Sequence, residues 1–296
     1  MISALIGLDP TQKSSDGFSG SAGIILYFQD KGFFSSVHIC GVIHHHLYTY
    51  PISFYREMKN ELAQEANKSI EKLVDGQFKN DSVKVLQSDS HLNESLVEKL
   101  CNYGMKKKAD VLLLSSTENP GAMHWILGSF CETAALVSSM PVLIIKPQAR
   151  LSEFAEEFRI LIAVDVNEPM TDKSLRWIAK KAAIPSAMVE LIYVEKAKST
   201  GSFLRIGKST TKTSAPIKEL KRLQAELTKK GIKTKASVLK GGSSISQSIV
   251  DYADNIQASL IITETSKRSR TRRILLGSTS RSILRMTKRP FLNLRF

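Results

Sequence analysis

The stretch LLGSTSRSILRMTKRPFLNL, residues 275–294, repeats the pattern of ILGSFCETAALVSSMPVLII, residues 126–145. In both copies a Gly-Ser pair opens a helical stretch, and a proline leads into a short apolar run that is typical of a buried strand. The two copies lie 149 residues apart, both at the glycine and at the proline. Upstream, Ile6–Asp9 corresponds to Ile162–Asp165. These matches indicate one structural unit that occurs twice in the chain.

Within each unit, strand-like runs alternate with helical patterns. In the second unit the predicted strands cover 160–164, 189–194, 235–239, 260–263 and 291–294, with helices between them and the last helix at 272–286. Strands that alternate with helices need crossover connections, so they form a mostly parallel sheet that helices cover on both faces. The sequence predicts an α/β fold of two tandem open parallel-sheet domains, residues 1–150 and 151–296.

Length and composition agree with this organisation. The 296 residues, 42% apolar and 24% charged, suit a globular chain of about two domains rather than a disordered or disulfide-dense one. No apolar run approaches the ~18 residues of a membrane span, and no secretory signal is recognisable. Three cysteines without C-x-x-C spacing indicate reduced thiols. We therefore expect a cytoplasmic protein without a transmembrane helix.

The charge is concentrated in the second unit. Residues 1–150 carry a net charge of −1, whereas residues 151–296 carry +15. After Glu264 the chain has no acidic residue, and a basic run extends from Lys267 to Arg273. The second unit is thus expected to attract anions.

The repeated Leu-Gly-Ser segments, the proline-led last strands and the aspartates after the first strands resemble the universal stress protein family. The resemblance covers nearly the whole chain as a tandem pair. It implies cytoplasmic proteins without catalysis that dimerise through their last strand, and many of them bind ATP or AMP at the carboxyl ends of the strands. The two halves of this chain are then expected to dock as a pseudo-dimer, which could pair again as a homodimer.

The family's nucleotide motif is G-x-x-G, nine residues, then G-[ST]. Glycines give phosphate oxygens access to backbone amides, and the Gly-Ser pair opens a helix whose N-terminus favours an anion. Here the first two glycines are replaced by Ser115 and Glu118 in the first unit, and by Glu264 and Lys267 in the second. A glutamate at these positions repels phosphate.

Part of the motif is retained. The resemblance implies that the candidate residues for binding ATP, AMP or another phosphate ligand are Asp9, Gly128, Ser129, Asp165, Gly277, Ser278, Thr279 and Ser280. The alternative interpretation is structural: the glycines permit tight turns, the serines cap helices, and the aspartates cap the loops that follow the first strands.

Other motifs carry weaker signals. Residues 201–209 look like a phosphate-binding P-loop, but five residues separate the glycines instead of four. Residues 240–244 are interpreted as a turn and helix cap, residues 44–46 as a histidine-containing loop rather than a zinc site, and Cys131 as a buried thiol rather than a reactive one. No catalytic triad, zinc-protease motif or paired-carboxylate motif is present. We assign no catalytic residue and no metal ligand.

The sequence is compatible with two functions. The protein is either a non-catalytic stress-response or regulatory module that binds a nucleotide or another phosphate ligand, or an interaction protein without nucleotide binding. In the second case its basic second domain docks an acidic protein partner. Nucleic acid is the less favoured partner, because the basic run lacks interleaved aromatic residues.

Overall fold

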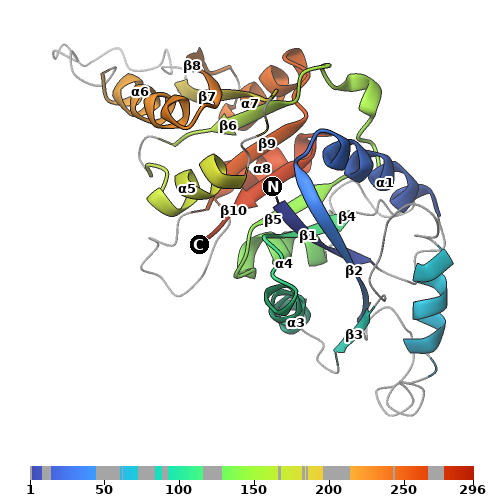
Figure 1. Ribbon diagram of the computed structural model, residues 1–296. Coiled ribbons are helices and arrows are strands. Elements are labelled where there is room, and N and C mark those ends of the chain that lie inside the picture. The colour runs from blue at the N-terminus through green and yellow to red at the C-terminus, as the bar shows by residue number, and fades with distance from the viewer. Residues whose placement is uncertain are drawn as a thin grey trace.

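The computed structural model describes residues 2–8, 15–44, 61, 63–72, 84–88, 93–115, 129–165, 168–181, 184, 186–195, 214–242, 244–265 and 277–296. These residues form one ten-stranded sheet with helices on both of its faces (Figure 1). The predicted α/β fold is confirmed.

The first half supplies five strands. Its described elements are β1 (Ile2–Leu8), α1 (Ser15–Asp30), β2 (Phe34–His44), a helical stretch at 63–72, β3 (Lys84–Ser88), α3 (Asn93–Lys106), β4 (Val111–Ser115), α4 (Ser129–Val137) and β5 (Val142–Ile145). A short 3-10 helix, η2 (Leu151–Glu153), begins the connection to the second half.

The second half repeats this order. Its described elements are β6 (Arg159–Ala163), α5 (Asp172–Lys181), β7 (Met188–Glu195), α6 (Ser214–Lys229), β8 (Lys233–Lys240), α7 (Ile245–Asn255), β9 (Leu260–Glu264), α8 (Ser278–Met286) and β10 (Phe291–Leu294). Helix α8 begins six residues later than the predicted start at Arg272. Gly277, with φ −51° and ψ 142°, precedes its first turn, and residues 271–276 lie outside the described residues.

The two halves join edge to edge in the sheet. The strand order is β3-β2-β1-β4-β5-β10-β9-β6-β7-β8, so each half has the same internal order and the second is reversed relative to the first. Neighbouring strands are parallel within each half, and β5 pairs with β10 in antiparallel fashion. This arrangement has the geometry of a pseudo-dimer that meets through its last strands.

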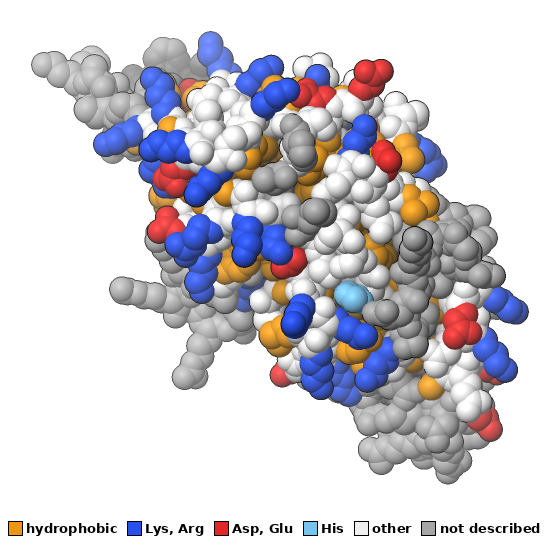
Figure 2. Space-filling view, viewed as in Figure 1, with side chains coloured by type: hydrophobic (Ala, Val, Ile, Leu, Met, Phe, Trp, Pro, Cys, Tyr) orange, Lys and Arg blue, Asp and Glu red, His pale blue; other side chains and the backbone are white. Residues whose placement is uncertain are grey.

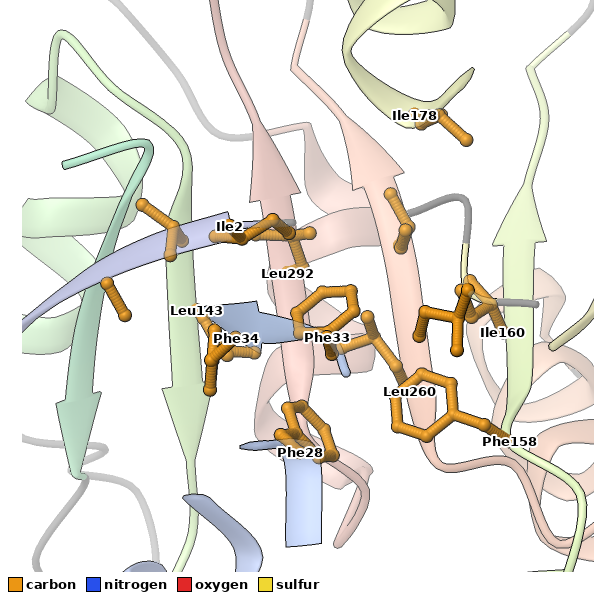
Figure 3. Packing of buried hydrophobic residues seen from close by; sticks show 14 of the residues in the cluster. Ile2, Phe28, Phe33, Phe34, Leu143, Phe158, Ile160, Ile178, Leu260 and Leu292 are labelled. Carbon is orange, nitrogen blue, oxygen red and sulfur yellow. The ribbon is translucent and has the colours of Figure 1, made fainter. Parts of the chain in front are cut away.

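Each face of the sheet carries a hydrophobic core that runs through both halves. One core contains residues of α1, α5 and α6, and the other contains residues of α3, α4, α7 and α8. On the first face, Phe28 and Phe33 pack with Phe158 of the second half at ring-centroid distances of 5.1 and 5.6 Å (Figure 3). Because these aromatic rings cross the junction, neither half buries its own apolar surface alone.

Polar contacts also cross the junction, and two of them are related by the pseudo-symmetry. Lys181 of α5 donates to Asp110 of the first half at 2.8 Å, and the Tyr27 hydroxyl of α1 lies 3.3 Å from that of Ser259 in the second half. In both cases the first helix of one half reaches the residue just before the fourth strand of the other. Two equivalent polar contacts, one from each half, therefore fix the position of the halves relative to each other.

No helix that the structure describes is long and apolar enough to cross a bilayer.

Candidate functional site

The carboxyl ends of β6 and β9 mark the point in the second half where the strand order reverses, and we refer to the space outside these ends as the second crevice. These two strands are parallel neighbours, with Ile160 opposite Leu260 and Ile162 opposite Ile262. The chain continues from β6 to β7 and β8 on one side, but from β9 to β10 on the other. In open α/β sheets, ligands bind outside the carboxyl ends of the strands at such a reversal of strand order. The pair β1 and β4 forms the equivalent point in the first half.

Asp165 lies at this edge, two residues after the end of β6, and its side chain is exposed. It is close enough to Tyr193 of β7 to raise the pKa of that phenol, an effect to which burial contributes most and Glu195 also contributes. The carboxylate therefore lies at the edge of the sheet that the carboxyl ends of the strands form.

Glu264, the last residue of β9, contacts the start of α5 through its side chain. One carboxylate oxygen accepts the Thr171 backbone N–H at 3.0 Å, and the other accepts the Thr171 hydroxyl at 2.7 Å. Thr171 in turn accepts the N–H of Ser174 at 3.2 Å and so caps the helix. The Glu264 charge is held against the positive end of α5.

Gly277 is the N-cap residue of α8, and its environment does not explain why it is a glycine. Its φ of −51° is open to any residue, and a Cβ built on it meets no atom of the described residues within 4 Å. Because glycine has no side chain, the first turn of α8 receives no side-chain cap from this position. Neither a strained turn nor tight packing against the described part of the chain accounts for this glycine.

Ser278, Thr279 and Ser280 form the first turn of α8. Ser278 is exposed, Thr279 is half-buried, and Ser280 is buried. Ser278 is therefore the first helical residue and not the cap that the structural interpretation assigned to it. The Ser246 hydroxyl of α7 donates to the Thr279 carbonyl at 3.4 Å, which brings the N-termini of α7 and α8 together.

The corresponding crevice of the first half is only partly described. Ser115, the equivalent of Glu264, lies at the end of β4 with its hydroxyl 2.7 Å from that of Ser21 on α1. Ser129 is the first residue of α4, but its side chain is not described. Asp9 and Gly128 lie outside the described residues.

The structure describes two further sequence features, the turn at residues 240–244 and the thiol of Cys131. Ser244 caps α7 by accepting the Gln247 N–H at 3.0 Å, which confirms the turn-and-cap interpretation of residues 240–244. Burial raises the pKa of the Cys131 thiol to about 12, as expected of a packing cysteine. The described residues contain no group of three His, Cys, Asp or Glu side chains that could hold a metal. Residues 45–46, 201–209 and 267–273 lie outside the described part of the chain.

Lys and Arg side chains cover much of one face of the molecule. Figure 2 shows them over the part that carries α5 and α6, with a smaller group over α3. On α5 and α6 the exposed members are Lys173, Arg176, Lys180, Lys218, Lys221 and Lys229. This surface accounts for part of the positive charge that the sequence places in the second half.

Comparisons with known proteins match this geometry. The family model described as "Universal stress protein family" matches residues 158–295. A universal stress protein from Archaeoglobus fulgidus DSM 4304 is 18% identical, with a TM-score of 0.65, over 99% of this chain and 96% of its own. A putative universal stress protein from Pseudomonas aeruginosa UCBPP-PA14 is 16% identical, with a TM-score of 0.61, over 99% and 93%.

A further match is a universal stress protein from Archaeoglobus fulgidus in complex with dAMP. It is 22% identical, with a TM-score of 0.34, over 47% of this chain and 98% of its own. No curated protein sequence matches the chain.

Proposed function

Because the model of the universal stress protein family matches residues 158–295, we propose that this protein is a tandem, non-catalytic regulatory module of that family that binds an adenine nucleotide. In this proposal residues 1–150 and 151–296 are its two domains, docked as a pseudo-dimer in the cytoplasm. The second crevice binds ATP or AMP, with the phosphates on the first turn of α8 and the adenosine near Asp165. The first crevice uses Asp9, Gly128 and Ser129 in the same way.

The observation that carries the proposal is Gly277. Its conformation and its surroundings would accept a side chain, yet the position has none. A glycine that neither the backbone nor the packing requires leaves room for a ligand to approach the first-turn N–H groups of α8. The helix dipole at this N-terminus favours a phosphate group.

The contacts of Glu264 reduce the repulsion that its negative charge would exert on a bound phosphate. The carboxylate is bound to Thr171 on the α5 side of the crevice, and both of its oxygens accept a hydrogen bond there. The positive end of α5 offsets some of its charge, so repulsion of a phosphate on α8 is weaker than the sequence alone suggests.

The test is nucleotide binding by Gly277→Ala, measured by isothermal titration calorimetry with ATP and AMP on the full chain. Native mass spectrometry of the purified protein first shows how many nucleotides are bound. An added methyl group blocks close approach of the phosphate, so we expect at least about a tenfold loss of affinity at one site. The thermal stability of the variant should stay that of the wild type, because the new Cβ meets open space.

Unchanged ATP binding in Gly277→Ala would remove the second crevice from the proposal. A wild-type chain that binds neither ATP nor AMP would contradict the nucleotide function as a whole. The interaction function would then be favoured, and its signature is binding to an acidic protein partner that weakens steeply as salt is added.

A further inference from the structure

Lys146 and Arg295 are equivalent residues that have different surroundings. They are 149 residues apart, and each directly follows the last strand of its half. Both are buried, with 8% and 5% of their surface exposed. A buried cation needs a partner, because loss of hydration destabilises its charge.

Lys146 has such a partner in the other half. Its Nζ donates to the backbone carbonyl of Arg285 at 2.7 Å, in the last turn of α8. A cation at the C-terminal end of a helix is also favoured by the helix dipole. The Lys146 charge is therefore stabilised by the structure itself.

Arg295 lacks an equivalent contact at one of its nitrogens. Its Nη1 atom is buried and makes no hydrogen bond in the described structure. Burial also lowers the pKa of this guanidinium, because it removes water from around the charge.

The alternation of β10 indicates which face Arg295 lies on. Phe291 and Asn293 pack on the side of α4 and α8, where the Asn293 amide donates to the Ala135 carbonyl at 2.9 Å. Leu292 and Leu294 pack on the opposite face, and Phe296 joins them there. Arg295 therefore lies on the α4 and α8 side, as Lys146 does.

Arg281 on α8 adds a second guanidinium to this region. It lies one turn before Arg285 and so on the same side of the helix. Its equivalent in the first half is Glu132, which forms an ion pair with Arg285 at 2.7 Å. The Nε atom of Arg281 is buried and makes no hydrogen bond in the described structure.

The pseudo-symmetry predicts that both arginines lie beside Leu136 of α4, which is the equivalent of Arg285. Around Arg285 the group of charges consists of Lys146, Arg285 and the carboxylate of Glu132. The equivalent group around Leu136 consists of Arg281 and Arg295. In this group Arg281 takes the place that the Glu132 carboxylate has in the first. The second region therefore has two cations and no carboxylate, whereas the first has two cations and one carboxylate.

We propose that Arg281 and Arg295 bind a phosphoryl group at the junction between α4, α8 and the end of β10. Guanidinium groups bind phosphate oxygens through paired N–H donors, which would satisfy the buried nitrogens. The Thr265 N–H donates to the Leu294 carbonyl at 2.9 Å, so Arg295 lies next to the strand that ends in the proposed nucleotide crevice. The phosphoryl group is either free phosphate or the terminal group of a nucleotide. The nucleotide case rests on the proposed function, whereas the free-phosphate case does not.

The test compares Arg295→Met with Lys146→Met in the full chain by thermal unfolding. Each protein is measured in sodium chloride, in inorganic phosphate and in ATP, at one ionic strength. Saturating phosphate should raise the Tm of the wild type by roughly 5 °C relative to chloride. Arg295→Met should lose this shift, and so should Arg281→Met, whereas Lys146→Met should keep it.

The Tm without any phosphate gives a second readout. Arg295→Met removes a poorly stabilised buried charge, so its Tm in chloride should equal or exceed that of the wild type. Lys146→Met leaves the Arg285 carbonyl without its donor, so its Tm should fall. A structural role for Arg295 predicts a fall in both variants.

Each outcome decides the proposal. A phosphate shift that only Arg281→Met and Arg295→Met lose supports a free-phosphate site, and a shift by ATP alone with the same losses assigns the group to a bound nucleotide. Equal shifts in Arg295→Met and the wild type overturn the proposal, as does the absence of any shift. Nucleotide binding that Gly277→Ala weakens and Arg295→Met leaves intact would overturn this inference and keep the proposed function.

Discussion

Leu143 of β5 and Leu292 of β10 lie directly opposite each other in the antiparallel pair that joins the two halves. They are 149 residues apart, which is the spacing of the sequence repeat. On either side of them, Ile144 pairs with Phe291 and Val142 pairs with Asn293. The 149-residue spacing relates Ile144 to Asn293 and Val142 to Phe291, so each of these two pairs is the internal equivalent of the other. A pseudo-twofold axis therefore passes between the two leucines, and each residue near it has an internal equivalent for comparison.

Asn293 breaks this symmetry, because its equivalent in the first half is Ile144. The buried amide accepts the hydroxyls of Thr263 at 3.3 Å and Thr265 at 2.8 Å, and it donates to the Ala135 carbonyl of α4 at 2.9 Å. Asn293→Ile leaves these groups unpaired, so the free energy of unfolding should fall by about 1–3 kcal/mol. Urea denaturation measures this change.

Thr263→Val is the matched control, because it removes only the longest of the three bonds at nearly constant volume. Its cost should stay at or below about 1 kcal/mol. If Asn293→Ile were as stable as the wild type, the amide would not contribute to holding the halves together.

The elements of the fold were largely predictable, because burial leaves a direct pattern in the sequence. Apolar β-branched runs marked the strands, and the capping residue Ser244 marked the start of a helix. The start of α8 was predicted too early, because Arg272 continues a helical pattern and the sequence does not show that Gly277 is outside the helix.

The contacts within the candidate site were harder to predict. Glu264 was expected to repel phosphate from its position in the motif, but Thr171, 93 residues earlier, holds its carboxylate. The periodicity of apolar residues in the sequence describes short segments only, so it cannot predict a hydrogen-bond partner 93 residues away. The same holds for the difference between Lys146 and Arg295, which appears only when the two halves are superimposed through the sheet.

Buried thiols should make the protein resistant to alkylation. Burial raises the pKa of Cys40 and of Cys131 to about 12. At pH 8 only about one thiol in ten thousand is then the reactive thiolate. Both cysteines should react with iodoacetamide far more slowly in the native protein than in guanidinium chloride, as peptide mass spectrometry measures. Fast native labelling of Cys131 would show instead that the N-terminus of α4 activates it.

Two adjacent glycines before α7 should respond differently to alanine. A Cβ on Gly241 would collide with the Glu195 carbonyl oxygen, to which the Gly241 N–H donates at 2.8 Å. Among the described residues, a Cβ on Gly242 meets only Ser248 Oγ, at 3.8 Å. Gly241→Ala should therefore lower the free energy of unfolding by about 1–3 kcal/mol. Gly242→Ala should change it by less than about 0.5 kcal/mol. Equal effects in denaturant titrations would mean that the loop moves to accept either side chain.

Removing the charge of Glu264 separates its structural role from its effect on ligands. Glu264→Gln keeps the side-chain shape but loses the carboxylate that α5 stabilises through Thr171, so the free energy of unfolding should fall by about 0.5–1 kcal/mol. One negative charge fewer beside the crevice should raise the affinity for ATP by about two- to fivefold. Asp172→Asn removes an exposed carboxylate from the first turn of the same helix without touching β9, and it should leave ATP affinity nearly unchanged. Calorimetric titration of both variants measures the difference. A loss of ATP affinity in Glu264→Gln would instead indicate that the carboxylate accepts a hydroxyl of the bound nucleotide, because removing a repelling charge cannot weaken the binding of an anion.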